Sequence, residues 1–450
     1  MSEAGPVKVI GGGLAGCEAA WQLAERGVSV VVFEQKPHRR TPAQTSDHLA
    51  ELVCSNSFRS SNPENAVGLI KEEMARLGSL ILSCGELARV PAGDAFAVDR
   101  EVFAAAVTER VRNHPRIEVV EGEVTELPTE GDVIIATGPL TSEGLAGRLR
   151  ELTGSDSLYF YDSIAPILDA ESLDGSIIYA LSRYGKGDGD DYLNCPMDAE
   201  TYARFHDALV TAERVPLRDF EKPRYFEGCL PVEVMAERGV DTLRYGPMKP
   251  VGLPDPRTDE IPHAVVQLRK ENKAGTAWNM VGFQTKLKYP EQARVFRMIP
   301  GMESVEFLRM GSIHRNTFIH SPSLLDKGNR LLSDPRLRFA GQITGVEGYV
   351  ESTASGLLTA LYLLGDRRSE PMGTPPGSTA LGAMMGHVHG NGSGEFQPQN
   401  VNFGLFPPLQ QRVKKRERKA AYAARAREDF AEWLEGLAVQ PLAMGMGKNV

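Results

Sequence analysis

The sequence predicts an α/β fold that begins with a parallel sheet, and three features of its N-terminal part support this. Val7–Ile10 is a short apolar run of the kind that forms a buried strand. It leads into the glycine-rich turn GGGLAG, and Leu14–Arg26 continues with the period of a helix. A second apolar run, Val28–Phe33, ends at Glu34. Strand, glycine turn, helix, strand and acid in this order are typical of a Rossmann-like unit that binds a dinucleotide.

The glycines of this turn are expected to hold the phosphates of the dinucleotide. Gly11 permits the tight turn, Gly13 lets the backbone approach a pyrophosphate, and Gly16 lets helix and strand pack closely. The N-terminus of the helix presents unpaired N–H groups to the phosphates, and an acid at the second strand end binds the ribose. The alternative is an ordinary glycine-rich turn. The expected contacts are Gly11, Gly12, Gly13, Leu14, Ala15, Gly16 and Glu34.

Two later segments are expected to return to the same cofactor. Asp132–Ile135 passes directly into Ala-Thr-Gly, and in flavoproteins of this kind a strand with that ending lies at the cofactor edge. Leu337–Ala340 is another strand candidate, and Tyr349–Leu364 has helical periodicity after a glycine-rich break. The N-terminus of that helix would stabilise the negative charge of a reduced flavin. These segments add Thr137, Gly138, Gly341, Gln342, Gly348 and Tyr349 to the expected contacts.

A segment of different composition and secondary-structure pattern separates the two parts of this cofactor domain. It combines a helical stretch, Ala199–Thr211, with strand candidates and with runs rich in Pro, Arg and Lys. We therefore predict a discontinuous Rossmann-like FAD-binding domain at residues 1–197 and 300–440, a smaller inserted α+β domain at 198–299, and a tail at 441–450.

Composition narrows the class of protein. The 450 residues suit two or three domains, and 42% of them are hydrophobic. No apolar run approaches the roughly eighteen residues of a membrane helix, and no secretory signal is recognised. The five cysteines include no C-x-x-C pair, so neither a zinc site nor a dithiol motif is indicated, and we expect no metal. Free thiols are typical of the cytoplasm, which is the expected location.

Charge is unevenly distributed along the chain. The formal net charge is −9, yet the run from Arg412 to Arg427 contains eight basic residues and one acid. The run is a good helix former. It is therefore either a solvated helix face or a helix that contacts phosphates.

Two further segments carry structural expectations. The Gly/Ser/Pro/His tract at residues 373–394 is expected to be a mobile loop, in preference to a metal site at His387 and His389. Phe403 and Phe406 are expected to be buried anchors. There is no second G-x-G-x-x-G turn and no cysteine pair, which argues against a flavin-dependent disulfide reductase.

Two cysteines have surroundings suited to chemistry. Cys54 lies in ELVCSNSFRS, beside the segment expected to cross the cofactor, and Cys229 lies in YFEGCLPVEV, between a glycine and a proline. A thiolate in such a polar turn is a nucleophile, whereas a lone cysteine is more often a small buried apolar residue. We expect Cys17, Cys84 and Cys195 to be of the second kind.

The motifs together closely resemble one family. GGGLAGCEAA, AELVCSNS, FEGCLPVEVMAERG, RYGPMKPVGL, MGSIHRNTFI, GQITGVEGYVES and NVNFGLFPPL resemble the TrmFO family, the folate- and flavin-dependent tRNA uracil-5-methyltransferases. The likeness extends over nearly the whole chain. The related GidA-type family shares the N-terminal glycines and the G-Q-x-x-G-x-x-G-Y segment, but not the two cysteine motifs in this form.

The resemblance implies a reaction and a set of residues. It implies methylation of the T-loop uridine of tRNA, with 5,10-methylenetetrahydrofolate as carbon donor, reduced FAD as hydride donor and NAD(P)H as reductant. It implies that Cys229 attacks the base and that Cys54 assists beside the flavin. It implies no membrane and no protein partner. Residues expected at the folate or the tRNA are His314, Arg315, Lys286, Lys288, Arg244, Lys249, Lys414, Lys415 and Arg418, and plain surface charge is the alternative for the lysines and for Arg244.

Three other functions remain open at this point. The same chemistry on a ribosomal RNA uridine has an identical sequence pattern. A flavin oxidoreductase for a small metabolite leaves the inserted domain and the basic run unexplained. A non-catalytic flavin-bearing RNA-binding protein leaves the two cysteine motifs unexplained.

Overall fold

The fold is known from a computed structural model, which describes residues 5–41, 43–153, 158–216, 230–390, 396–437 and 442. Its main sheet has six strands in the order β16-β17-β7-β1-β2-β6, all parallel except β16, which is antiparallel to β17. In chain order the strands are β1 (Val7–Ile10), β2 (Val30–Glu34), β6 (Ile117–Glu121), β7 (Val133–Ile135), β16 (Arg330–Leu331) and β17 (Asp334–Phe339).

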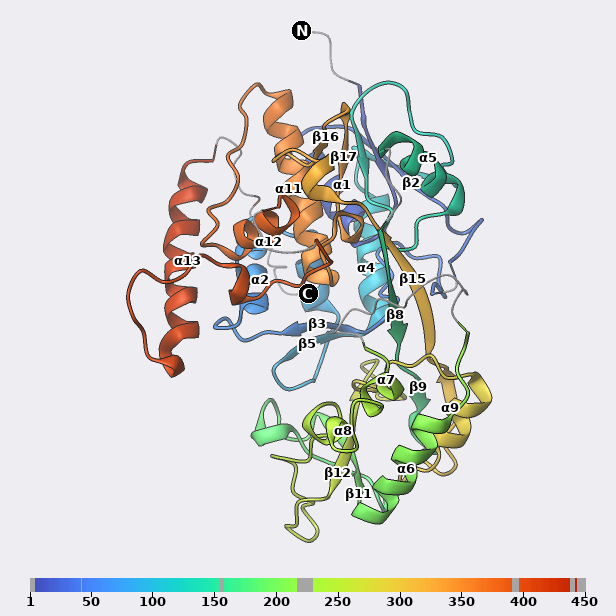
Figure 1. The fold of residues 1–450 in the computed structure, drawn as a ribbon. Coiled ribbons are helices and arrows are strands. Elements are labelled where there is room, and N and C mark those ends of the chain that lie inside the picture. The colour runs from blue at the N-terminus through green and yellow to red at the C-terminus, as the bar shows by residue number, and fades with distance from the viewer. Residues whose placement is uncertain are drawn as a thin grey trace.

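Helices cover both faces of this sheet, as parallel strands require. On one face α1 (Leu14–Ala24) packs against α11 (Tyr349–Arg367), and α5 (Glu143–Thr153) covers the other face (Figure 1). The side chains of β7 alternate accordingly, because Ile134 belongs to the first core and its neighbours Val133 and Ile135 to the second. The first face also carries α2 (Ala66–Arg76), α3 (Leu80–Leu87) and α4 (Arg100–Arg112).

A second six-stranded sheet, entirely antiparallel, forms the lower part of the molecule in Figure 1. Its strands in spatial order are β10 (Tyr179–Ala180), β11 (Tyr192–Met197), β12 (Ala264–Lys270), β13 (Ala277–Met280), β9 (Ile167–Asp169) and β14 (Phe307–Arg309). Its own apolar core packs under α6 (Ala199–Thr211), α7 (Val232–Ala236), α8 (Thr242–Tyr245) and α9 (Tyr289–Phe296). The domain division at residues 198 and 299 stays a prediction, and this sheet includes strands from both sides of that range.

Two smaller sheets lie where the cofactor unit, built on the first sheet, meets the second unit. A ribbon of β8 (Leu158–Ile164) and β15 (Ser312–Phe318) runs between the two units (Figure 1). The other sheet contains β3 (Ser57–Ser60), β4 (Arg89–Val90) and β5 (Ala95–Val98). The short helix α10 (Ser321–Leu324) follows β15. Among the described helices, none is long and apolar enough to cross a membrane.

The sequence located the starts of the main helices well. Helices expected from residues 14, 199 and 349 begin at those residues. Phe406 is buried and Phe403 partly buried, and both rings pack with Tyr422 of α13 (Arg418–Glu435).

The expectation of a mobile loop at residues 373–394 was wrong for the central part of this range, and residues 391–394 lie outside the described residues. Ala380–Val388 forms a buried helix, α12, which Thr379 caps at its first turn. Glu73 accepts hydrogen bonds from the backbone N–H groups of Ala380 and Leu381, both at 2.8 Å. Glycine serves packing here, because a Cβ at Gly382 would lie 1.9 Å from the carbonyl oxygen of Pro376.

The close approach of α1 to α11 makes a specific prediction about stability. A Cβ at Gly356 would lie 2.2 Å from the carbonyl oxygen of Ala15. Gly356→Ala is therefore expected to force the helices apart and to lower the free energy of unfolding by about 1–3 kcal/mol, measured by urea denaturation. Gly147→Ala in α5 is the control, because only the side chain of Arg150 comes within 4 Å, and it should stabilise slightly. Equal effects of the two changes would contradict this interpretation.

Candidate functional site

A cleft lies at the carboxyl ends of the parallel strands of the main sheet. Its volume is about 1040 Å³, including the part open to solvent, which is of the size that large cofactors need. Ten of the expected cofactor contacts line it: Gly11, Gly13, Leu14, Ala15, Glu34, Thr137, Gly138, Gly341, Gln342 and Tyr349. Gly12, Gly16 and Gly348 are not among the lining residues.

The glycine turn has the form of a phosphate cradle. A Cβ at Gly11 would lie 2.5 Å from the carbonyl oxygen of Ala136, and a Cβ at Gly16 would lie 1.9 Å from that of Gly11. At Gly13 a Cβ would meet nothing within 4 Å, so the backbone is open to the cleft. Gly13 begins α1 without any side-chain cap, which leaves N–H groups of the first turn for an anion.

Glu34 is fixed at the end of β2. Its carboxylate accepts hydrogen bonds from the backbone N–H of Gly12 at 2.9 Å and from that of Lys36 at 3.0 Å. The side chain is buried at the wall of the cleft. These bonds leave acceptor capacity on both oxygens, as recognition of a ribose hydroxyl requires.

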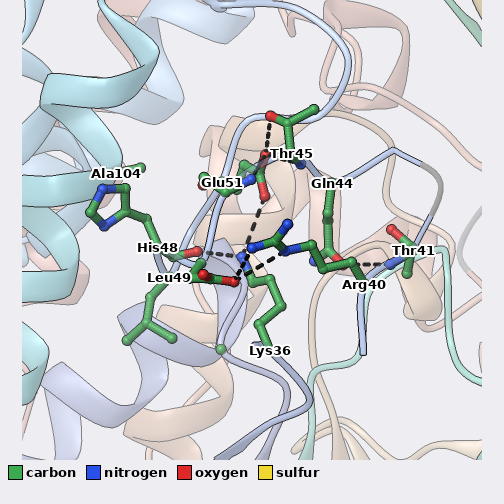
Figure 2. Close-up of polar contacts among 12 residues, drawn as sticks. Lys36, Arg40, Thr41, Gln44, Thr45, His48, Leu49, Glu51 and Ala104 are labelled. Atoms are coloured by element: carbon green, nitrogen blue, oxygen red, sulfur yellow. Dashed lines mark hydrogen bonds and ion pairs between the residues drawn. The ribbon is translucent and has the colours of Figure 1, made fainter. Parts of the chain in front are cut away.

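The segment after β2 folds over the cleft and is held by its own polar contacts (Figure 2). The buried amine of Lys36 donates to the carbonyl of His48 and lies 3.4 Å from a carboxylate oxygen of Glu51. Glu51 also accepts from the backbone N–H and the hydroxyl of Thr45, at 2.7 and 2.9 Å. The buried hydroxyl oxygen of Thr41 lines this cleft and has no hydrogen-bond partner in the described ranges. Glycine cradle, acid and unpaired hydroxyl thus fit a dinucleotide.

Cys54 lies just beyond the cleft, which Val53 and Tyr349 line. The phenol oxygen of Tyr349 accepts hydrogen bonds from the backbone N–H of Cys54 at 2.7 Å and of Ser55 at 2.9 Å. Burial, and then the neighbouring Cys54, raise the pKa of Tyr349 well above its usual range, so the phenol stays neutral. The thiol of Cys54 lies 3.7 Å from the carbonyl oxygen of Ser163 in β8.

Arg100 and Arg269 both form hydrogen bonds with residues 52–56, the segment that contains Cys54. The guanidinium of Arg100 donates to the carbonyl oxygens of Leu52 and Cys54 and pairs with Glu271 at 2.7 Å. Arg269 of β12 donates to the side-chain oxygens of Asn56 at 2.9 Å and of Ser55 at 3.0 Å. Asn56 itself donates to the carbonyls of Val98 and Lys270. The C-S-N segment therefore joins the cofactor unit to the second sheet.

The other cysteines divide as the sequence suggested, as far as they are described. Cys17, Cys84 and Cys195 are fully buried, and burial raises the pKa of each thiol. Cys229 lies outside the described residues. The chain directly after it is anchored, because Val232 donates to the carbonyl of Gln284 at 2.7 Å, and Glu233 accepts from Thr285 and from the backbone of Lys286.

Of the residues expected at folate or tRNA whose side chains are described, none lines the cleft. Lys288 pairs with Glu213 at 2.7 Å, and Arg244 pairs with Asp241 at 2.6 Å, while Lys249 also lies in the second unit. His314 and Arg315 are in β15, paired with residues 162 and 161 of β8, and their side chains are not described. Lys414, Lys415 and Arg418 are exposed at the start of α13.

The sequence analysis missed several residues that line the cleft and the residues that hold Cys54. Thr41, Gln44 and Glu51 line the cleft and belong to the polar segment after β2, and only their position in that segment could have indicated this. Glu123 follows β6, and the carboxyl end of a neighbouring parallel strand is where such a residue could have been sought. No local pattern marks Arg100 or Arg269. In the described residues, no group of three or more potential metal-binding side chains is present.

These features define a dinucleotide-binding α/β protein with a second, antiparallel unit beside its cofactor cleft. The family described as "GIDA: Glucose inhibited division protein A" matches residues 6–371. The methylenetetrahydrofolate--tRNA-(uracil-5-)-methyltransferase TrmFO of Geobacter sulfurreducens is 61% identical over 430 residues, covering 96% of this chain and 99% of that protein. The protein of the same name from Myxococcus xanthus is 58% identical over 432 residues, covering 95% and 94%.

The fold agrees with these sequence relatives. The structure of Aquifex aeolicus GidA in its form II crystal superposes with a TM-score of 0.68 at 15% identity, covering 95% of this chain and 73% of that chain. The chain belongs to the GIDA family and, within it, to the TrmFO group.

The hydrogen bonds of Tyr349 predict a measurable effect. Tyr349→Phe removes the oxygen that accepts two N–H groups, so we expect the free energy of unfolding to fall by about 1–3 kcal/mol and Cys54 to react faster with iodoacetamide. Peptide mass spectrometry measures the alkylation of Cys54.

Tyr362→Phe on the same helix is the matched control. Its buried hydroxyl has no hydrogen-bond partner among the described residues, so the same substitution should leave stability unchanged or higher. A larger loss at Tyr362 than at Tyr349 would contradict the assignment.

Proposed function

We propose that this protein methylates C5 of the T-loop uridine of tRNA, with 5,10-methylenetetrahydrofolate as carbon donor, reduced FAD as hydride donor and NAD(P)H as reductant. The observation that carries the proposal is the 61% identity to a methylenetetrahydrofolate--tRNA-(uracil-5-)-methyltransferase over 96% of the chain. A protein with free cysteines that acts on tRNA belongs in a reducing compartment, so we propose a cytoplasmic location.

The cleft supplies the groups that FAD needs. The open backbone at Gly13 and the uncapped start of α1 would hold the pyrophosphate, and Glu34 would hold a ribose. Tyr349 and Gln342, which also line the cleft, would face the ring system. Bound there and reduced, FAD supplies the hydride that completes the methyl group.

A cysteine is required because C5 of uracil is a weak nucleophile. A thiolate that adds to C6 forms a sulfur–carbon bond, and the electrons of the C5=C6 bond move toward the C4 oxygen. C5 can then attack the methylene carbon of the folate, and one of the two bonds from that carbon to folate nitrogen breaks. Loss of the C5 proton expels tetrahydrofolate through the other carbon–nitrogen bond and leaves an exocyclic methylene on C5. Hydride addition to this methylene forms the methyl group and restores the C5=C6 bond as the thiolate leaves C6. We assign the attack on C6 to Cys229, with Cys54 assisting beside the flavin.

The surroundings of Cys54 suit this assisting role. The backbone of Cys54 is held by Tyr349 and Arg100, so its thiol has a defined place beside the cleft. The target base must leave the folded RNA loop to reach this position. Substrate binding therefore needs contacts that hold the RNA backbone outside the cleft.

The start of α13 suits such contacts. Lys414, Lys415 and Arg418 are exposed there, and none of them forms an ion pair within the described part of the chain. Cations at a helix N-terminus are electrostatically unfavourable, because the helix dipole is positive at that end. Phosphates of the tRNA T-arm would offset this cost. In Figure 1 the N-terminal end of α13 is its lower end, which faces the side of the molecule where the second unit lies.

Removal of the nucleophile tests the reaction itself. With Cys229→Ala we expect methylation of T-arm RNA to fall by roughly 10³-fold or more, while FAD absorbance and unfolding remain as in the wild type. Cys195→Ala, at a buried thiol of the second unit, is the control and should retain activity. Full activity of Cys229→Ala would refute the assignment, and an inactive wild type would refute the proposed function.

The contribution of the basic helix start is tested by salt dependence. The triple variant Lys414→Ala, Lys415→Ala, Arg418→Ala should bind tRNA with a shallower dependence of log K on log salt, by about 0.7–0.9 for each phosphate that the protein no longer neutralises. Arg112→Ala, Arg148→Ala, Arg150→Ala removes the same charge from the exposed surface of α4 and α5 and should keep the wild-type slope. Identical slopes for both triple variants would show that the basic run at residues 412–427 is ordinary surface charge that does not contact the tRNA.

A further inference from the structure

Four residues of the second sheet form one row across its strands. Arg269 of β12 pairs with Asn279 of β13, Asn279 pairs with Ile167 of β9, and Ile167 pairs with Arg309 of β14. Directly paired residues on neighbouring strands share one face of a sheet. The opposite face packs in the apolar core of the second unit, through Leu168, Leu268, Trp278 and Met280. The row therefore lies on the face away from that core.

Both ends of the row contact the cofactor unit. At one end Arg269 donates to the side chains of Ser55 and Asn56, next to Cys54. At the other end Arg309 donates to the carbonyl oxygen of Ala43, at 2.9 Å, in the segment that crosses the cleft. The middle of the row is thus held between these two contacts, at the junction of the two units.

Arg309 reaches this junction through a local irregularity of its strand. The register shifts between Phe307 and Arg309, so that Leu308 is left exposed and Arg309 pairs with Ile167. Bulges of this kind redirect a side chain and are common beside active sites. Partial burial, and then Arg100, lower the pKa of Arg309. Its hydrogen bond to Ala43 engages one of five donors, and no described carboxylate pairs with it.

Asn279, in the middle of the row, has a buried amide that is not satisfied. The residue is 4% exposed, and its amide nitrogen has no acceptor in the part of the chain that the structure describes. Buried polar groups in folded proteins almost always have a partner, so this unmatched donor is available to a ligand. The thiol of Cys54 lies 3.7 Å from the carbonyl oxygen of Ser163, four residues before Ile167 of the row.

We propose that Asn279 and Arg309 bind the lactam edge of the heterocycle that reacts beside Cys54, that is, its C4 carbonyl and the adjacent N3–H. Uracil and the pterin ring of folate both carry this edge. A carboxamide matches it with one donor and one acceptor, and the guanidinium adds a charged donor to the carbonyl oxygen. This inference rests on the proposed function and specifies which residues recognise its substrate.

The chemistry explains why a cation would be useful at this oxygen. When the thiolate adds to C6 of uracil, the electrons of the C5=C6 bond move to the C4 oxygen. A partly buried guanidinium stabilises that charge more strongly than water does. In the folate the same interaction would orient the pterin relative to the flavin.

Asn279→Leu gives a test in which binding and folding should change in opposite directions. Leucine has nearly the shape of asparagine and removes an unsatisfied donor, so the holoenzyme should unfold at an equal or higher urea concentration. Gln267→Leu is the matched control, because its amide lies two residues before Arg269 and is satisfied by Asn194 and Arg183. It should lose stability and keep substrate affinity. Arg309→Lys, which keeps the charge, tests the guanidinium separately.

Two measurements on the FAD-loaded enzyme distinguish the two possible heterocycles. Titration of the oxidised enzyme with tetrahydrofolate, followed by flavin absorbance, gives the dissociation constant of the pterin. Release of tritium from tRNA labelled at C5 of uridine gives the rate at which the enzyme adds to the base. Loss of one hydrogen bond corresponds to about a tenfold change, so we expect Asn279→Leu and Arg309→Lys to change at least one of these quantities by about that factor.

The outcomes separate cleanly. A larger dissociation constant for tetrahydrofolate supports the proposal with the pterin as ligand. A lower rate of tritium release supports it with uracil as ligand. Values within about twofold of the wild type in both assays, for both variants, would overturn it. A wild-type enzyme that responds to neither assay would instead contradict the proposed function.

Discussion

The two hydrogen bonds that Tyr349 accepts from the backbone of Cys54 and Ser55 are the interaction on which the site depends. Tyr349 is the first residue of α11, and α11 packs against α1, whose start forms the phosphate cradle. A single phenol oxygen therefore fixes the place of the cysteine segment relative to the cofactor. Because Tyr349 is partly buried and its pKa is raised, this oxygen keeps its proton through the ordinary pH range.

The second unit completes this arrangement from the other side. Arg269 binds Ser55 and Asn56, and Glu271 fixes Arg100, which in turn holds the carbonyl of Cys54. Each residue of the C-S-N segment thus has partners in more than one element. An isolated cysteine on a loop would lose its position at little cost, whereas here a displacement would leave several buried polar groups unpaired.

The cofactor cleft could be predicted from the sequence because its parts obey local rules. The spacing of Gly11, Gly13 and Gly16 and the place of Glu34 follow from the turn and from the two strands beside it. The surroundings of Cys54 obey no such rule. Arg100 binds a carbonyl 46 positions away, and Arg269 binds an amide 213 positions away. Neither residue carries a pattern that distinguishes it from a surface arginine.

The error at residues 373–394 has a related cause. Glycine and histidine suggested mobility, but Gly382 of α12 allows close packing. Burial lowers the pKa of His389 to about 4, so that it lies neutral against Asn329. Amino-acid composition indicates the conformational preference of a segment in isolation. The capping of α12 by Glu73, more than 300 positions earlier, depends on tertiary contacts that composition does not record.

The separation of Cys54 from Tyr349 also bears on how the protein is made. The two residues are 295 positions apart, and the wall of the cleft is not complete until Ser352 has been added. During synthesis the glycine turn, its helix and the cysteine segment leave the ribosome long before their partners exist. The N-terminal half must therefore wait with apolar strand surface exposed, as is general for folds with distant pairings. Cofactor loading is consequently a late event, which can begin only when nearly four-fifths of the chain has been translated.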